Sequence, residues 1–152
     1  MEYYIVSYGE EHLCLDIQNN SKKRMAKIIA TRFHGHPSQK WRIQGDLIYS
    51  VHSDLVLDIK FGEGCYKSII QWPPHNGSNQ TWTFYDDGSI RSPKGYCIQI
   101  NKENYIETGN FYGGNYQKWK LIRCDEIDLK NVTINIFNLS INQSKTNMLS
   151  LH

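Results

Sequence analysis

The chain has 152 residues, which suits one domain large enough to bury a core without metal or disulfide staples. Its 17 basic and 15 acidic residues leave a formal net charge of +2, too weak a field to favour a nucleic acid as partner. No stretch is long and apolar enough to predict a membrane span, so membrane insertion is not expected.

The first predicted elements are short strands within residues 3–46. Apolar segments stand at Leu15-Asp16-Ile17 and Ile28-Ile29, and Trp41-Arg42-Ile43 alternates with the period of two that is typical of a half-buried strand. This last segment begins with the tryptophan of a Gln-x-Trp triplet, Gln39-Lys40-Trp41. No helical periodicity of useful length competes with the strand pattern.

The same elements return twice further along the chain. The triplet recurs as Gln80-Thr81-Trp82 and Gln117-Lys118-Trp119, so its three tryptophans are 41 and 37 residues apart. The segment ahead of it recurs as Leu57-Asp58-Ile59 and Ile98-Gln99-Ile100. A period near 40 residues that matches at two points indicates a repeated supersecondary unit. The predicted domain, residues 1–126, therefore holds three units, at about 3–46, 47–88 and 89–125.

This threefold pattern resembles the ricin-type (R-type) lectin family, whose Gln-x-Trp repeats belong to a β-trefoil of three pseudo-symmetric four-stranded units. The resemblance covers about residues 3–125 and implies an all-β fold. It also implies that Trp41, Trp82 and Trp119 fill the core and that the triplet glutamines brace local structure. The triplets therefore report the fold and not the activity.

The second unit combines the groups that sugar recognition requires. One face of a galactose-like ring suits an aromatic side chain, and its hydroxyls need fixed acceptors and donors. By the resemblance, Asp58 would bind the sugar hydroxyls, Trp72 would stack on the ring and Asn79 would contact the same hydroxyls. Trp72 is the one tryptophan outside the triplets, although it could instead be a further core residue. The candidate sugar-binding residues are Asp58, Gln71, Trp72, His75, Asn79 and Gln80.

In that candidate site, Gln80 would hold the Asp58 carboxylate in place and His75 would reach the rim. Pro73 and Pro74 follow the platform directly and would stiffen its backbone.

The first unit keeps the aspartate and the triplet glutamine but has Thr31 where the platform is expected and Ser38 in place of the asparagine. A stacking surface here would need a different bend of the loop. The alternatives are a solvated loop or a weaker, altered site. Its residues would be Asp16, Phe33, His36 and Gln39.

In the third unit the corresponding residues are replaced. Gln99 stands at the aspartate position, Gly109 at the platform position and Tyr116 at the asparagine position, and the intervening segment is four residues shorter than in the second unit. We therefore expect no sugar site of the family's kind here. A nearby aromatic cluster either meets a different ligand or a protein surface, or covers the shortened loop. Its members are Tyr105, Phe111, Tyr112 and Tyr116.

Residues 127–152 extend beyond the three units. Val132-Thr133-Ile134-Asn135-Ile136 alternates strictly and predicts a further strand. It would pair with an edge of a second copy to form a homodimer, or belong to a linker, a frayed tail or the start of another module.

The remaining motifs predict neither a cofactor nor a metal. His34-Gly35-His36 lacks further clustered ligands. Cys14 and Cys97 occupy equivalent places and are expected to be small core residues rather than part of a disulfide framework. The chain begins without the basic region and apolar run of a secretory signal, and a glycosylation sequon falls on Asn79 inside the candidate site. We expect cytoplasmic residence or leaderless release rather than secretion through a signal peptide.

The sequence thus predicts a non-enzymatic lectin for glycans that contain terminal galactose or N-acetylgalactosamine, acting mainly through the second unit. A glycosidase would need a second carboxyl group flanking the bond, and Asp58 has no evident partner in that role. The alternatives are a protein-interaction trefoil of the inhibitor kind, or the targeting subunit of a larger toxin or hydrolase complex.

Overall fold

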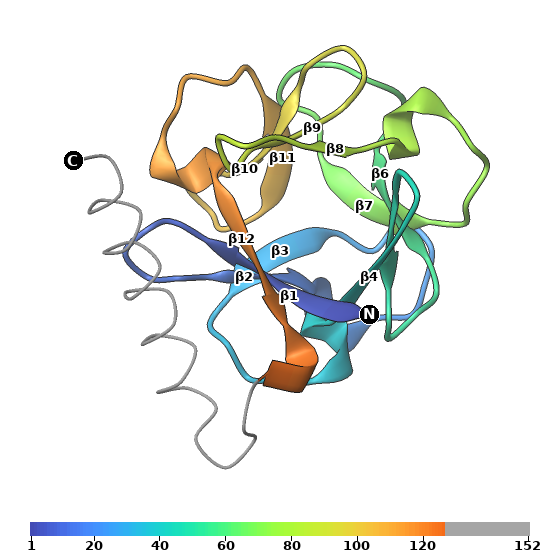
Figure 1. Ribbon diagram of the computed structural model, residues 1–152. Coiled ribbons are helices and arrows are strands. Elements are labelled where there is room, and N and C mark those ends of the chain that lie inside the picture. Colours follow the sequence, from blue (N-terminus) through green and yellow to red (C-terminus); the bar gives the residue numbers. More distant parts are fainter. Residues whose placement is uncertain (127–152) are drawn as a thin grey trace.

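The computed structural model describes residues 1–126, and every structural statement below concerns those residues. The strand and the dimer contact predicted within residues 127–152 lie outside them. Three lobes surround a common centre in Figure 1. Among the described residues no helix is long and apolar enough to cross a membrane.

Twelve strands within residues 1–126 fall four to a unit. The first four are β1 (Glu2–Ser7), β2 (Cys14–Ile17), β3 (Ile28–Thr31) and β4 (Trp41–Gln44). The next four are β5 (Leu47–Ser50), β6 (Val56–Ile59), β7 (Ile69–Trp72) and β8 (Thr83–Phe84). The last four are β9 (Ile90–Arg91), β10 (Cys97–Ile100), β11 (Ile106–Gly109) and β12 (Trp119–Arg123). Single turns of 3-10 helix are η1 (Gln18–Asn20), η2 (Pro37–Gln39), η3 (Ser78–Gln80), η4 (Asn115–Gln117) and η5 (Cys124–Glu126).

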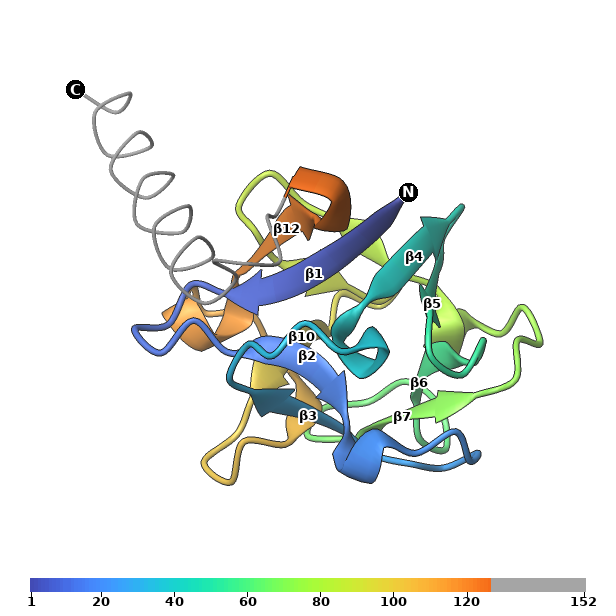
Figure 2. The ribbon, with the colours of Figure 1, turned by 90° about the horizontal axis from the view of Figure 1, so that it is seen from below.

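Antiparallel pairing links these strands into two sheets. One follows the order β3-β2-β1-β4-β5-β6-β7, with β12 also paired to β1, and the other follows β11-β10-β9-β8. The β1–β12 ladder, from Tyr3 opposite Arg123 to Ser7 opposite Trp119, joins the first unit to the third. Figure 2 shows β1 and β12 beside one another on the side where β4 and β5 also stand. The all-β trefoil expected from the repeats is confirmed.

The triplet tryptophans lie in the shared core, as predicted. Trp41, Trp82 and Trp119 are all buried in one apolar cluster. Each indole N–H donates to the backbone carbonyl of the residue that precedes the aspartate position, at 3.1 to 3.2 Å. These acceptors are Leu15, Leu57 and Ile98. Each buried indole therefore has its single donor satisfied, which removes the main cost of burying tryptophan.

The triplet glutamines hold the loops in front of them. Gln39, Gln80 and Gln117 are fully buried. Each side-chain oxygen accepts a backbone N–H from the residue five positions earlier, at 2.9 to 3.0 Å. Each side-chain NH2 group donates to the carbonyl seven positions earlier, at 2.8 to 3.0 Å. These bonds fix the same loop conformation three times, in front of three different sets of side chains.

Neighbouring units of the trefoil contact one another through loops that dock on strands. The Met25 N–H donates to the Gln71 carbonyl at 3.0 Å, so the β2–β3 loop of the first unit docks on β7 of the second. Tyr66 likewise donates to the carbonyl of Thr108 on β11 at 2.9 Å, which carries a loop of the second unit onto the third. The cycle closes where Ala30 donates to the Asn104 carbonyl at 2.8 Å. The hollows of the second and third units are therefore walled in part by the preceding unit, through Met25 and Tyr66.

The four cysteines, all within the described residues, are free thiols. Cys14 and Cys97 are fully buried on β2 and β10, where they serve as small core residues as expected.

Candidate functional site

The second unit forms a hollow of about 200 Å³ between β6, β7 and η3. Asp58 on β6, Trp72 at the end of β7 and Asn79 on η3 all line it, together with His75 from the connecting loop. Antiparallel register sets Asp58 opposite Ile70 and Val56 opposite Trp72. The carboxylate and the indole therefore stand two positions apart along the hairpin, on the same face of its sheet. Four of the six candidate residues meet here; we call this the second-unit hollow.

The Asp58 carboxylate is buried and held from two sides. Its Oδ2 accepts from Gln80 Nε2 at 2.8 Å and its Oδ1 accepts from Asn79 Nδ2 at 3.1 Å, while His75 Nε2 stands 3.6 Å from Oδ2. Burial raises the pKa of Asp58, although the hydrogen bond from Gln80, the nearby His75 and the bond from Asn79 act in the opposite direction. Gln80 therefore has the bracing role expected of it, behind the hollow.

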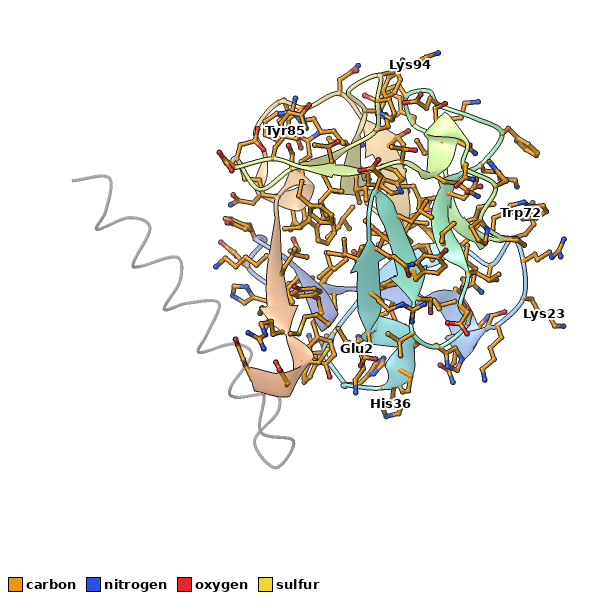
Figure 3. All side chains as sticks on the ribbon, turned by 45° about the vertical axis from the view of Figure 1, so that its right-hand side comes forward. Glu2, Lys23, His36, Trp72, Tyr85 and Lys94 are labelled. Carbon is orange, nitrogen blue, oxygen red and sulfur yellow. The ribbon has the colours of Figure 1, made fainter. Side chains whose placement is uncertain are left out.

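Trp72 is a half-buried side chain outside the apolar core, so the alternative of a further core tryptophan is wrong. The guanidinium of Arg24 lies over its ring, 5.6 Å from the ring centroid. Figure 3 shows Trp72 at the edge of the molecule on the same side as Lys23, whereas His36 projects from another edge. The indole is thus anchored beside the first unit's basic loop.

Gln71 does not line the second-unit hollow. It precedes Trp72 on β7 and so points to the opposite face of the strand, where it is fully buried. Its Nε2 donates to the carbonyls of Ser21 at 3.1 Å and Lys23 at 2.8 Å, and its Oε1 accepts from Ser53 Oγ at 2.8 Å. Gln71 therefore holds the loop of the first unit that carries Arg24 and Met25.

Sequence reasoning missed four residues that line the second-unit hollow: Met25, Lys60, Phe61 and Ile70. Phe61 is 84% exposed, with the Lys60 ammonium 5.1 Å from its ring centroid. An aromatic residue within a glycine-rich turn is a signal that could have found Phe61. Met25 comes from the first unit, so nothing near the second triplet in sequence points to it.

In the first unit the protein itself supplies partners for the carboxylate. Asp16 Oδ2 accepts from Thr31 Oγ1 at 2.6 Å and contacts His34 Nε2 at 2.9 Å, while Gln39 Nε2 lies at 3.5 Å. Its Oδ1 accepts the Ile17 N–H at 2.7 Å. Fewer acceptor positions therefore remain for a sugar hydroxyl than on Asp58.

The two stacking candidates of the first unit separate. His36 lines a hollow of about 300 Å³ with Asp16, and its ring centroid lies 4.6 Å from that of His34. Phe33 is buried instead and packs edge-on against Tyr4, with centroids 4.8 Å apart. The structure thus brings Asp16, Gln39 and His36 together and leaves Phe33 in a small core cluster.

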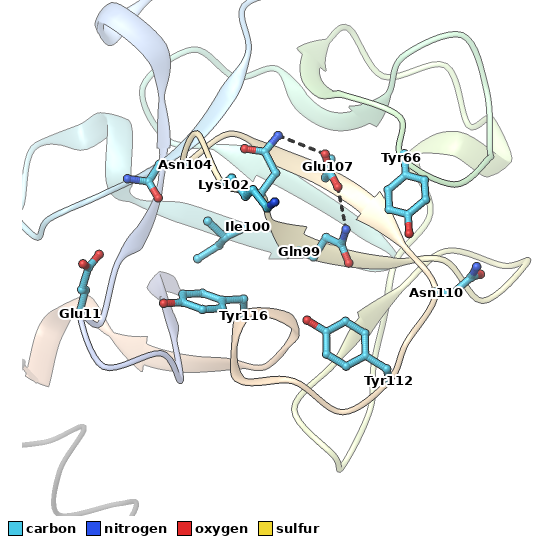
Figure 4. A pocket seen from close by; sticks show the side chains of 11 residues that line it. Glu11, Tyr66, Gln99, Ile100, Lys102, Asn104, Glu107, Asn110, Tyr112 and Tyr116 are labelled. Carbon is cyan, nitrogen blue, oxygen red and sulfur yellow. Dashed lines mark hydrogen bonds between the residues drawn. The ribbon is translucent and has the colours of Figure 1, made fainter.

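The third unit carries the largest of these hollows, about 760 Å³. Figure 4 shows Gln99 near its centre, with Glu107 hydrogen-bonded to it and Tyr66, Tyr112 and Tyr116 around it. We call this the third-unit hollow. Gly109 stands opposite Cys97, as Trp72 stands opposite Val56, so the platform position is empty here, as expected.

No group of three or more His, Cys, Asp or Glu side chains within residues 1–126 is placed to hold a metal ion.

Known proteins resemble this chain both in sequence and in fold. The sequence profile of the ricin-type beta-trefoil lectin domain matches residues 2–82 and again residues 47–147. Agglutinin-1 of Abrus precatorius is 39% identical over 46 residues, which are 30% of this chain. Those residues span only 8% of the agglutinin's length.

Solved structures resemble the whole trefoil. The designed threefold symmetric protein ThreeFoil has a TM-score of 0.73 at 23% identity, covering 80% of this chain and 98% of its own. The C-half of an earthworm R-type lectin in complex with GalNAc gives 0.67 at 22%, covering 80% and 97%. The exo-beta-1,3-galactanase 1,3Gal43A from Clostridium thermocellum gives 0.68 at 27%, but the match covers only 30% of that enzyme. These likenesses confirm the β-trefoil.

Proposed function

The chain belongs to the ricin-type β-trefoil lectin family, and on that premise we propose that it is a non-enzymatic lectin for terminal galactose or N-acetylgalactosamine. The second-unit hollow is the main site in this proposal. The observation that carries it is the convergence of a buried carboxylate, an amide and a half-buried indole, from Asp58, Asn79 and Trp72.

The hydrogen bonds of the second-unit hollow leave acceptors for sugar hydroxyls. Each Asp58 oxygen takes one short bond from an amide, at 2.8 and 3.1 Å, so each keeps a lone pair for a hydroxyl. Asn79 directs its NH2 group to Asp58 and to the Ile59 carbonyl, which leaves its own side-chain oxygen to accept. Hydrogen bonds to a charged group contribute about 1.5–3 kcal/mol each. Asp58 and Asn79 would therefore bind adjacent hydroxyls while Trp72 stacks on the apolar face of the ring.

Two relatives support a galactose-type ligand. The earthworm R-type lectin half was solved with GalNAc, and the bacterial relative is an exo-beta-1,3-galactanase. The small volume of the second-unit hollow, about 200 Å³, suits one ring rather than an extended glycan. Such a site gives weak affinity alone, so useful binding would come from several sites acting together. Self-association through residues 127–152 is one proposed source of those sites.

Retention on galactose-linked resin, with elution by free galactose, tests the proposal. Trp72→Ala and Asp58→Asn should each abolish retention with the fold intact by circular dichroism, and Trp72→Phe should keep part of it. Tyr85→Ala is the matched control, because Tyr85 is an exposed aromatic residue that does not line the second-unit hollow. Retention that survives both Trp72→Ala and Asp58→Asn would remove the second unit from consideration.

A second candidate is a targeting role within a larger protein or complex. The galactanase and a mosquitocidal holotoxin both share this fold over only 30% and 17% of their own chains. A wild-type protein that ignores galactose, N-acetylgalactosamine and lactose resins would instead favour a protein-interaction trefoil.

The proposed dimer is tested separately by light scattering. Removing residues 127–152 should lower the solution mass to that of one copy. An unchanged oligomer would reject the dimer without touching the sugar site.

A further inference from the structure

The third unit keeps a carboxylate, but on the other strand of its hairpin. In the first two units the strand partner of the aspartate is an isoleucine, because Asp16 pairs with Ile29 and Asp58 with Ile70. In the third unit the same register pairs Gln99 with Glu107. The acid lost at position 99 therefore reappears directly across the hairpin.

Amides orient Glu107 much as they orient Asp58. Gln117 Nε2 donates to Gln99 Oε1 at 2.8 Å, and Gln99 Nε2 passes the interaction on to Glu107 Oε2 at 2.7 Å. Asn101 Nδ2 donates to the other oxygen, Oε1, at 3.1 Å. Each oxygen of the carboxylate thus has one amide donor and one position left for a ligand hydroxyl, as in the second unit. The triplet glutamine Gln117 thus orients the Glu107 carboxylate indirectly, through the side chain of Gln99.

The absence of an aromatic platform at Gly109 follows from this rearrangement. A Cβ at Gly109 would collide with the Gln99 amide, so the space that a platform residue would need is taken by the Gln99 side chain. Stacking surfaces come from elsewhere. Tyr112 donates its backbone N–H to Gln117 Oε1 at 2.9 Å, which gives it the loop position that His75 has in the second unit.

Tyr66 enters the third-unit hollow from the second unit and is fixed there by its backbone. Besides its own bond to the Thr108 carbonyl at 2.9 Å, the neighbouring Lys67 N–H donates to Thr108 Oγ1 at 2.9 Å. Thr108 is fully buried, so this anchor is shielded from water. Tyr66 takes the place that Met25 takes beside the second-unit hollow, and both have positive φ angles, 56° and 72°. The position that Met25 fills beside the second-unit hollow is thus filled by an aromatic side chain, Tyr66, beside the third-unit hollow.

The exposure of these tyrosines argues against their being a cover for the shortened loop. Tyr66 is 74% and Tyr112 75% exposed, so neither shields much of the core. They stand around a hollow of about 760 Å³, compared with about 200 Å³ in the second unit. The larger volume lies within the range of about 300–1,000 Å³ typical of pockets for drug-sized ligands, whereas the second-unit hollow falls below it.

We propose that the third-unit hollow is a second carbohydrate site, chemically distinct from the first, that binds a saccharide of two or more rings. Glu107 accepts hydroxyls of one ring, and Tyr66 and Tyr112 stack on the apolar faces of the chain. The proposal shares with the proposed function only the carbohydrate nature of the ligand, and it needs neither Asp58 nor Trp72.

A glycan array of galactosides from one to four rings, including galactose, lactose and β-1,3-linked galactobiose, tests the site in the Asp58→Asn background, where the second-unit hollow is disabled. We expect this variant to lose galactose but to keep binding to some di- to tetrasaccharides. Adding Glu107→Gln should weaken that binding at least about tenfold, the scale of one lost hydrogen bond to a charged group. Adding Tyr112→Ala removes a stacking surface and should weaken it by about two- to tenfold. Tyr112→Phe should restore it, and Tyr49→Ala, outside the hollow, should change nothing.

The outcomes separate the two sites. Oligosaccharide binding that disappears in Asp58→Asn, or that persists unchanged in both added variants, overturns the third-unit site and leaves the second-unit proposal standing. Oligosaccharide binding that depends on Tyr112 and Glu107 in a wild-type protein that ignores galactose resin overturns the second-unit proposal alone.

Discussion

Removing the triplet glutamine of the second unit should weaken both the fold and sugar binding. Gln80→Ala deletes a bond from the His75 N–H at 2.9 Å, one to the Pro73 carbonyl at 3.0 Å and one to Asp58 Oδ2 at 2.8 Å. At about 1 kcal/mol for each neutral bond and about 2 kcal/mol for the bond to the carboxylate, the free energy of unfolding should fall by about 4 kcal/mol. A domain with a free energy of unfolding of about 5–15 kcal/mol would stay folded but with much less stability. Binding should therefore be measured well below the unfolding temperature of the variant.

Gln39→Ala is the matched control in the first unit. It deletes four neutral bonds at 2.8 to 3.2 Å, from the N–H groups of His34 and Gly35 and to Arg32 O and Thr31 Oγ1. The contact of Gln39 with Asp16 Oδ2 is long, at 3.5 Å, so Gln39 holds that carboxylate less than Gln80 holds Asp58. At about 1 kcal/mol for each neutral bond, the unfolding free energy of Gln39→Ala should fall by about 4 kcal/mol, close to the loss in Gln80→Ala. Urea titration followed by tryptophan fluorescence measures both losses, and calorimetry with galactose measures binding. Only Gln80→Ala should lose binding. Equal loss of galactose affinity in both variants would refute the idea that the glutamine acts by holding Asp58.

Other expectations follow from burial. Trp82→Ala should lower the unfolding free energy by about 3–5 kcal/mol and Trp72→Ala by less than about 1, as measured by urea titration; equal losses would contradict their different environments. Because burial raises the pKa of Asp58, acidification should neutralise it earlier than an ordinary aspartate, so galactose binding falls. Over the same pH range its contribution to stability should rise, since the folded state then binds the proton more tightly; Asp58→Asn should abolish that rise in urea midpoint. Burial also raises the pKa of the Cys14 thiol to about 12 and of Cys97 to about 11, so iodoacetamide at neutral pH should modify neither before unfolding, as peptide mass mapping would show.

The repeat spacing was enough to predict the fold because the same residue pattern occurs in three units, and all three have to adopt the same local structure. Trp41, Trp82 and Trp119 have to occupy equivalent places, and the structure buries all three. The same alignment predicted that Trp72, which has no counterpart, lies outside the core, and it does. A repeated pattern therefore carries more information than any single segment of this chain.

The candidate site was predicted where its residues are close in sequence and less well elsewhere. Asp58, Asn79 and His75 sit in one hairpin and its following loop, so alignment on the triplet brings them together. Gln71 does not line the second-unit hollow, because adjacent residues of a strand point to opposite faces and Gln71 directly precedes Trp72. The sequence contained this signal, since the two residues are adjacent in it.

Residues that reach a hollow from another unit leave no local signal. Met25 and Tyr66 each enter the hollow of the next unit, and the docking bonds of their backbones cannot be read from side-chain spacing. Phe33 likewise packs against Tyr4 on β1, a contact between segments far apart in the chain. Long-range placement of this kind follows from the closed trefoil and not from the triplet.

Because loops dock between units, the second-unit and third-unit hollows each take part of their wall from the preceding unit. A unit copied or replaced as a block of about 40 residues would bring its hairpin and triplet but would inherit its Met25-like or Tyr66-like wall from whatever precedes it. A substitution in the first unit can thus retune the ligand preference of the second while every residue of the second stays the same. Bound ligand would in turn favour the docked state of both units and so link saccharide occupancy to the cohesion of the whole trefoil.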